Sequence, residues 1–244
     1  MAKMKQLLRG LVPGALLHRY RKWRWGHTWF DFEDRPLRDV FSEIYQYNMW
    51  GRGDGRFYSG PGSDLHATAP YTAAVRAFIG EHAIASVVDV GCGDFRVGTQ
   101  FLETGVRYHG VDVVPALIRH NAATYGSDRV TFSCLDATRD DLPDGDLCLV
   151  REVFQHLSND EIRRALDNCR KFPYVVVTER IASPGRMTAP NAEHTHGPNT
   201  RSDSGSGVVL DAPPFAENVT RVLVDLDQGD GTILRTVLVD NRLY

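Results

Sequence analysis

Residues 86–95 read Ser86-Val87-Val88-Asp89-Val90-Gly91-Cys92-Gly93-Asp94-Phe95, an apolar run that ends in a Gly-x-Gly turn. This pattern is typical of the first strand and turn of a nucleotide-binding α/β unit, where glycine lets the backbone approach a ligand. Asp89 and Asp94 flank the glycines, and Arg96 stands where a dinucleotide-binding motif has its third glycine. Because two carboxylates repel a pyrophosphate and attract a cation, the turn predicts a positively charged ligand.

Three further apolar segments also end in polar residues. Residues 108–112 end at Asp112, which lies 21 positions after Gly91, about where related folds bind a ribose diol. Residues 130–135 precede Asp136 and Ala137, which could read an adenine edge, and residues 146–150 lead into the segment 151–156. The carboxyl ends of strands form the ligand site of an open α/β sheet, so we expect these residues to share one site. The alternative for Asp112 and Asp136 is a solvated strand end.

In this order and spacing, the four segments resemble those of class I S-adenosylmethionine (SAM)-dependent methyltransferases, from about residue 41 to residue 215. The resemblance implies a Rossmann-like α/β fold, with a mostly parallel sheet, a C-terminal antiparallel hairpin and helices on both faces. It also implies SAM as cofactor and S-adenosylhomocysteine (SAH) as product. An NAD-linked oxidoreductase would share the strand, turn and helix, but the two acids and the missing glycine disfavour it.

The resemblance further implies where the cofactor is held. The methionine part of SAM is expected at the glycine turn, the ribose at Asp112 and the adenine at Asp136. Asp94 could equally cap the following helix. The complete set of expected cofactor residues is Asp89, Gly91, Gly93, Asp94, Asp112, Val113, Asp136, Ala137, Arg151, Tyr58 and Ser63.

The rest of the chain supports alternating helices and strands. Pro115 opens a predicted helix over 115–125, and Ser158 with Glu161 forms a capping box before another helix. Residues 174–178 predict a fifth, buried strand, and residues 219–226 and 233–239 predict a hairpin.

Composition fits an enzyme-sized α/β domain. The chain has 244 residues, of which 42% are hydrophobic and 24% are charged. Its 4 cysteines form no Cys-x-x-Cys pair, so we expect reduced thiols and a cytoplasmic protein. We expect residues 1–40 to form an arm, residues 41–85 a helical lid, and residues 86–244 the SAM-binding domain, with an acceptor loop over 180–215.

Charge is concentrated at the amino terminus. Residues 1–30 carry seven basic residues and no acid, whereas the whole chain has a net charge of −3. We expect the arm to pack on its own acidic domain or on a second subunit; peripheral contact with anionic lipid is the alternative. The acidic body argues against nucleic acid as a partner. The oligomeric state is left open.

His156 is the first candidate for a catalytic base, since it follows the fourth strand and its unperturbed pKa lies near working pH. A histidine that only orients the loop is the alternative. Glu152 could be the base instead, orient His156 or bind substrate.

Two other segments are expected to complete the site. Tyr58 and Ser63 lie upstream of the first strand, where related enzymes fold a lid over the cofactor; a surface turn is the alternative. The long polar stretch after residue 178 is expected to bind the acceptor, because such an insertion in a compact domain is often functional. Its candidate substrate-binding residues are Glu179, His194, His196 and Arg201. No metal site is expected, since His194 and His196 lack a third ligand, and a magnesium requirement is left open.

The expected acceptor is a saccharide. Polar groups interleaved with Trp50, Tyr58 and Phe215 suit a polyhydroxylated molecule with apolar ring faces. The pattern over residues 41–63 also resembles bacterial saccharide O-methyltransferases, and the length and basic start are similar to an actinobacterial enzyme of the methylmannose polysaccharide pathway. Methyl transfer to a lipid or another small metabolite is the alternative.

Overall fold

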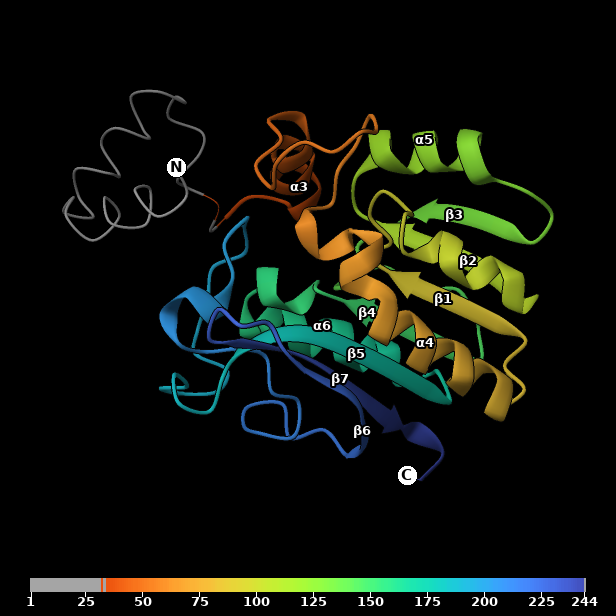
Figure 1. The fold of residues 1–244 in the computed structure, drawn as a ribbon. Helices are drawn as coiled ribbons and strands as arrows, with labels where there is room; N and C mark the ends of the chain where they lie inside the picture. The colour runs from red at the N-terminus through yellow and green to blue at the C-terminus, as the bar shows by residue number, and fades with distance from the viewer. Residues whose placement is uncertain (1–31, 33, 244) are drawn as a thin grey trace. The chain divides into compact units, whose positions relative to one another are not determined.

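The computed structural model describes residue 32 and residues 34–243, so nearly all of the predicted arm lies outside the described residues. The core element is a seven-stranded sheet with the order β3-β2-β1-β4-β5-β7-β6 (Figure 1). Strands β1 to β5 pair in parallel, whereas β7 is antiparallel to β5 and β6. The strands are β1 (Ser86–Val90), β2 (Arg107–Asp112), β3 (Val130–Cys134), β4 (Leu147–Arg151), β5 (Tyr174–Ala182), β6 (Val219–Asp227) and β7 (Thr232–Asp240).

Helices cover both faces of this sheet, which confirms the predicted fold class (Figure 1). The α-helices are α3 (Leu37–Gln46), α4 (Leu65–Glu81), α5 (Pro115–Tyr125) and α6 (Asn159–Cys169). Short 3₁₀ helices are η2 (Pro61–Ser63), η3 (Gly98–Thr104), η4 (Phe154–His156), η5 (Arg201–Ser204) and η6 (Asn241–Leu243).

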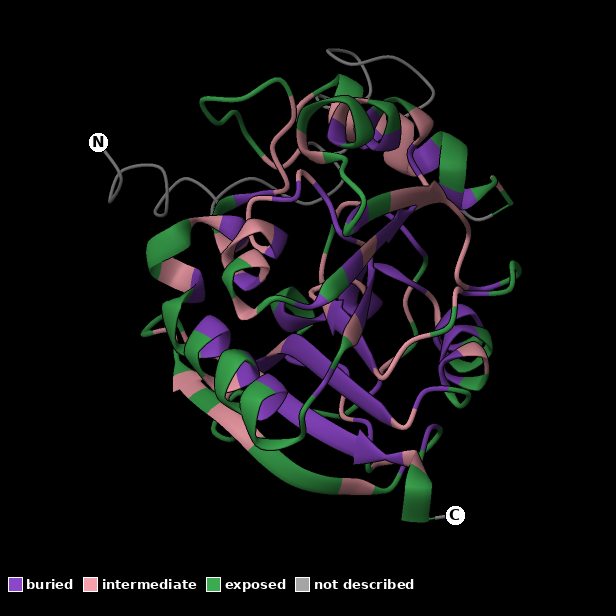
Figure 2. Ribbon diagram, turned by 90° about the vertical axis from the view of Figure 1, so that its right-hand side faces the viewer, coloured by how far each residue is buried: buried purple, intermediate pink, exposed green. Residues whose placement is uncertain are grey.

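Alternate strand residues build two hydrophobic cores. Cys148 and Val150 of β4 point into the core that contains α6, whereas Leu147 and Leu149 point into the core that contains α4. Successive side chains of a strand face opposite sides of the sheet, so a continuous apolar run is needed where both faces are covered. Figure 2 shows the central strands buried and the edge of the sheet more exposed.

Local signals fix where the helices begin. Pro115 occupies the first turn of α5. At α6, the Ser158 Oγ accepts a hydrogen bond from the Glu161 N–H, and the Glu161 carboxylate accepts one from the Ser158 N–H at 2.8 Å. The capping box predicted from the sequence is therefore present.

Strand β5 is longer than the sequence predicts. It continues from the predicted end at Thr178 to Ala182, because β7 pairs with it over this whole length, including Glu179 with Arg235 and Arg180 with Leu234. Glu179 and Arg180 therefore belong to the sheet, and the loop expected from residue 180 begins only after Ala182.

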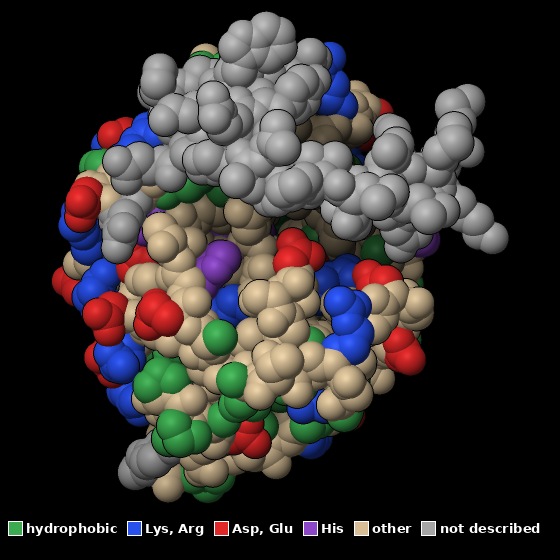
Figure 3. All heavy atoms as spheres, turned by 90° about the vertical axis from the view of Figure 1, so that its left-hand side faces the viewer, with side chains coloured by type: hydrophobic (Ala, Val, Ile, Leu, Met, Phe, Trp, Pro, Cys, Tyr) green, Lys and Arg blue, Asp and Glu red, His purple; other side chains and the backbone are tan. Residues whose placement is uncertain are grey.

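Surface features of the described residues are mixed. Figure 3 shows acidic and basic side chains interspersed along one edge of the face in view. None of the described helices combines the length and the apolar character that crossing a membrane requires. The four cysteines are unpaired thiols, and Cys92, Cys148 and Cys169 are buried.

Candidate active site

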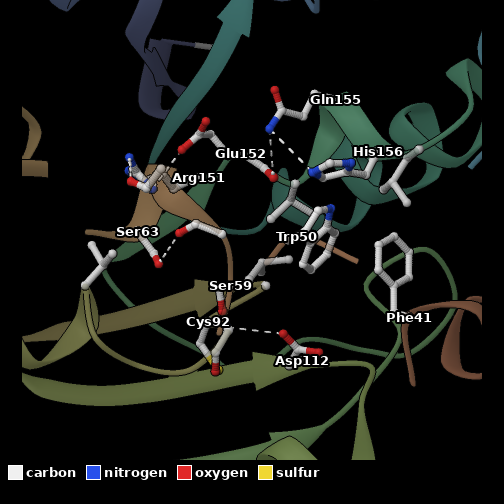
Figure 4. A pocket seen from close by; sticks show the side chains of 18 of the residues that line it. Phe41, Trp50, Ser59, Ser63, Cys92, Asp112, Arg151, Glu152, Gln155 and His156 are labelled. Carbon is white, nitrogen blue, oxygen red and sulfur yellow. Dashed lines mark hydrogen bonds and ion pairs between the residues drawn. The ribbon is translucent and has the colours of Figure 1, made fainter. Parts of the chain in front are cut away.

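A cavity of about 540 Å³ lies at the carboxyl ends of β1, β2 and β4 (Figure 4). The glycine turn after β1 and the residues after β2 and β3 form one part of its wall. Residues of α3 and of the segment 59–63 form another. A third is formed by Pro198, Thr200, Ser202 and Asp203 with the β6–β7 turn. Four strand ends predicted to share a site therefore do so.

The glycine turn is tightly enclosed. Gly91 and Gly93 have φ values of 74° and 56°, which side chains rarely adopt. A Cβ added to Gly91 would overlap Val153, and one added to Gly93 would overlap the Ser59 hydroxyl. Neither position has room for a side chain, so the backbone itself faces the cavity.

Asp112 lies at the end of β2 and is only 8% exposed. Its carboxylate accepts hydrogen bonds from the Gly93 N–H at 3.2 Å and the Val114 N–H at 3.0 Å. Burial raises the pKa of Asp112 to about 6, although these N–H groups oppose the rise. Val113, Asp136 and Ala137 also line the cavity.

Two more carboxyl groups line the same part of the cavity. Asp89 accepts a hydrogen bond from the Tyr108 hydroxyl at 2.7 Å, and burial raises its pKa to about 6. Asp94 accepts one from the Ser59 N–H at 3.1 Å, while its own N–H donates to the Ser59 Oγ at 2.8 Å. Asp94 thus holds the segment 59–63 against the glycine turn. Burial raises the pKa of Asp94 as well. This part of the cavity is acidic and suits a cation.

The two predicted lid residues differ in position. Ser63 lines the cavity, and its hydroxyl donates to the Gly60 carbonyl at 2.7 Å. Tyr58 does not line it: its hydroxyl donates to the Asp64 carboxylate at 3.2 Å, and the Arg96 guanidinium lies 5.4 Å from its ring centre. Tyr58 therefore helps to hold the segment 59–63, which we call the lid segment. Ser59, and not Tyr58, faces the cavity.

Arg151 and Glu152 lie beside the lid segment. Arg151 donates to the Gly62 carbonyl at 2.7 Å and pairs with Glu152 at 3.0 Å, while its Nε has no hydrogen-bond partner among the residues that the structure describes. Glu152 also lies 3.7 Å from the Arg180 Nε. With both oxygens near guanidinium groups, Glu152 is held as an ionic partner and is poorly placed to accept a substrate proton.

His156 lines the cavity beside Trp50, with ring centres 5.1 Å apart, and is 9% exposed. Its Nδ1 lies 3.1 Å from both the Gly197 and the Asn199 carbonyl oxygens, so Nδ1 must carry the proton. Burial lowers the pKa of His156 to about 4. The ring is therefore neutral at neutral pH, and its Nε2 presents a lone pair.

Glu179 and Arg201, predicted to bind substrate, do not line the cavity. The Glu179 carboxylate accepts hydrogen bonds from three successive N–H groups, of residues 153–155, at 2.8–3.2 Å. Burial raises the pKa of Glu179 to about 8, against the effect of these donors. Arg201, 1% exposed, donates to the carbonyls of Phe154 and Leu157 at 2.9 and 2.6 Å. Together they clamp η4, the turn that carries His156.

The two loop histidines also lie outside the cavity lining. His196 is buried and its Nδ1 lies 2.8 Å from the Glu161 carboxylate. His194 lies 3.1 Å from the Asn199 carbonyl through Nε2. The described residues contain no group of three or more histidine, cysteine or acidic side chains that could hold a metal. The structure gives both histidines a part in folding the loop.

Some residues that line the cavity were not predicted from the sequence. Tyr45 lines the cavity and its hydroxyl lies 2.8 Å from the Ser59 Oγ, while Gln155 lies beside His156. A lone tyrosine on a helix or a glutamine in a turn belongs to no sequence motif. These residues are recognised only in the structure, where α3 and the lid segment lie over the strand ends.

Comparison with known proteins agrees with this geometry. Residues 88–172 match the family model described as a methyltransferase domain. Over these residues the chain is similar to a methyltransferase domain. This stretch runs from β1 to the residues just before β5 and so includes the glycine turn, Asp112 and His156. A search of curated proteins finds no match.

Solved structures of methyltransferases share the fold of this chain. A Burkholderia thailandensis 1,6-didemethyltoxoflavin-N1-methyltransferase is 20% identical, with a TM-score of 0.59, over 84% of this chain and 86% of that chain. The N-methyltransferase NodS from Bradyrhizobium japonicum is 16% identical, with a TM-score of 0.54, over 81% and 98%. Human N-acetylserotonin methyltransferase is 12% identical, with a TM-score of 0.53, over 84% of this chain but only 60% of that chain.

Proposed function

We propose that this methyltransferase binds SAM in the acidic part of the cavity and methylates a hydroxyl group of a sugar or oligosaccharide. The observation that carries the proposal is His156, a neutral histidine with a fixed tautomer that lines the cavity and whose acceptor Nε2 meets the Gln155 carboxamide nitrogen at a long 3.5 Å. When bound, SAM supplies a methyl group whose C–S bond breaks, with its electrons passing to sulfur, as the C–O bond to the acceptor forms.

The residues present fit this cofactor. Asp112 offers carboxylate oxygens to a ribose diol, and Gly91 and Gly93 line the cavity with backbone alone, where the methionine part would lie. Asp89 and Asp94 add negative charge for the sulfonium and amino groups. The Arg151 Nε, which has no hydrogen-bond partner in the described part of the chain, lies beside the lid segment, where a ligand carboxylate would gain a cation. Among the expected cofactor residues, only Tyr58 lies away from the cavity lining.

His156 is proposed to take the proton of the attacking hydroxyl at Nε2. The Gly197 and Asn199 carbonyls hold the Nδ1 proton in place and would stabilise the imidazolium that forms. A hydroxyl acceptor needs such a base because its neutral oxygen becomes positively charged as the new bond forms.

The saccharide assignment rests on the mixture of groups around His156. Trp50 offers an aromatic face, and its Nε1 donates to the Pro198 carbonyl at 3.2 Å, which holds the ring in place. Thr200, Ser202 and Asp203 line the cavity nearby and can bind hydroxyls. Phe215 and Tyr58, also expected to supply ring faces, do not line the cavity: Phe215 packs in the core around α6.

A second candidate acceptor is a planar apolar metabolite. Leu37, Phe41 and Leu157 line the cavity together with Trp50 and His156, and the Phe41 and His156 ring centres are 6.4 Å apart. This apolar wall favours an aromatic hydroxyl, which would need the same base.

Methyl transfer to fractionated cell extract tests the proposal. With labelled SAM, we expect label in saccharide fractions, read as a mass increase of the acceptor. His156→Ala should lower turnover at least about a hundredfold, the usual contribution of a general base, and leave the Kd for SAM nearly unchanged. His66→Ala, at an exposed position on α4, is the matched control. Label only in lipid or aromatic fractions would contradict the saccharide assignment, and full activity of His156→Ala would remove it from the mechanism.

A further inference from the structure

Gln155 has an unusual environment beside the proposed base. It lines the cavity in η4 and is only 4% exposed. Its carboxamide nitrogen lies 3.5 Å from both the Glu152 carbonyl oxygen and the His156 Nε2. Its Oε1 is buried and has no hydrogen-bond partner among the described residues.

The orientation of this carboxamide follows from His156. Because the His156 Nδ1 carries the ring proton, Nε2 is an acceptor, and the group that faces it must be the donor nitrogen of Gln155. The Glu152 carbonyl, another acceptor, faces the same nitrogen. Figure 4 shows this nitrogen turned toward His156 and the carboxamide oxygen on its other side. Reversing the amide would place oxygen against two acceptors.

A buried carbonyl oxygen without a donor costs free energy, and native proteins satisfy nearly all such groups. The unpartnered oxygen belongs to a cavity-lining residue whose carboxamide nitrogen faces the His156 Nε2, the atom that is proposed to take the acceptor's proton. A donor on the ligand would satisfy it.

We propose that Gln155 Oε1 binds a second hydroxyl of the acceptor, adjacent to the one that is methylated, so that the acceptor is a vicinal diol. This inference rests on the proposed function, since it takes His156 Nε2 as the partner of the reacting hydroxyl. Consecutive residues of one turn present the two acceptors, and hydroxyls on neighbouring carbons can reach both. An isolated hydroxyl would leave Gln155 Oε1 unpaired. The site thus selects a diol and methylates one of its oxygens.

Periodate oxidation tests the inference, because it cleaves vicinal diols and spares isolated hydroxyls. The cell fraction that accepts label from SAM is divided, and half is treated with periodate and then borohydride before the assay. We expect labelling of the treated half to fall at least about tenfold. Equal labelling of both halves overturns the vicinal diol. Failure of the proposed function looks different, since no fraction would then take label even before treatment.

A variant pair tests the residue itself. Gln155→Met keeps the side-chain length and removes the acceptor oxygen, so the KM for the labelled acceptor should rise about tenfold while the Kd for SAM stays unchanged. The midpoint of thermal unfolding should not fall, because an unsatisfied buried oxygen is removed. Gln100→Met is the control: Gln100 lies outside the cavity lining, with hydrogen bonds to Thr68 and Thr72. An unchanged acceptor KM in Gln155→Met, or an equal rise in Gln100→Met, overturns the assignment.

Discussion

The charge of Asp112 is expected to make cofactor binding depend on pH. Burial raises the pKa of its carboxyl group to about 6, so it is ionised at neutral pH and takes up a proton as the pH falls through 6. The attraction for a cation is then lost, and the group becomes a weaker acceptor for hydroxyls. SAM affinity should therefore weaken as the pH falls from 7 to 5. SAH, which lacks the sulfonium charge, should show a smaller change.

Asp112→Asn keeps the shape and one acceptor oxygen but removes the charge. We expect the Kd for SAM at neutral pH to rise about tenfold to a hundredfold, since hydrogen bonds to charged groups contribute about 1.5–3 kcal/mol. The dependence on pH should become shallower without vanishing, because Asp89 also titrates near 6. Asp128→Asn, at an exposed position, is the control. An affinity and a pH dependence equal to those of the wild type would show that Asp112 does not contact the cofactor.

At the scale of an element, the turn η4 is held from both ends. The Glu179 carboxylate accepts from its N–H groups and the Arg201 guanidinium donates to its carbonyls. In Glu179→Ala, three backbone donors would lose their partner, and each buried unsatisfied group costs about 1–3 kcal/mol. We expect the free energy of unfolding in urea to fall by about 3 kcal/mol or more, and turnover to fall with it because His156 is carried by the turn.

Glu103→Ala provides the matched comparison for this element. Glu103 pairs with Arg76 at 2.6 Å but its side chain is 81% exposed, so its loss should change stability by less than about 0.5 kcal/mol. Equal stability of the two variants would mean that Glu179 does not hold the turn.

The strands and helices that support the site could be predicted from local patterns. Residues 86–90 and 147–150 form buried strands because an apolar run needs two covered faces, and Ser158 with Glu161 starts α6 because its cap satisfies free N–H groups. The roles of Glu179 and Arg201 could not be predicted. They depend on β7 extending β5 and on the following loop folding back onto η4, both contacts between distant parts of the sequence.

The arrangement of the whole sheet brings the separate motifs together. The sheet order places β1 between β2 and β4, so the glycine turn lies between Asp112 and the turn that carries His156. The sequence predicts that four polar strand ends meet at the carboxyl edge of the sheet, and residues from all four line the cavity. Tyr45 and Ser59 complete its wall only because α3 and the lid segment, which carry no motif of their own, close over the strand ends.

Isothermal titration calorimetry with SAM, SAH and NADH tests the central claim, that the acidic glycine turn binds a cationic sulfur cofactor. At neutral pH we predict that SAM and SAH each bind one molecule per chain and that NADH produces no binding heat, because its pyrophosphate would meet the carboxylates of Asp89, Asp94 and Asp112. Binding of NADH, with no heat from SAM or SAH, would contradict the account.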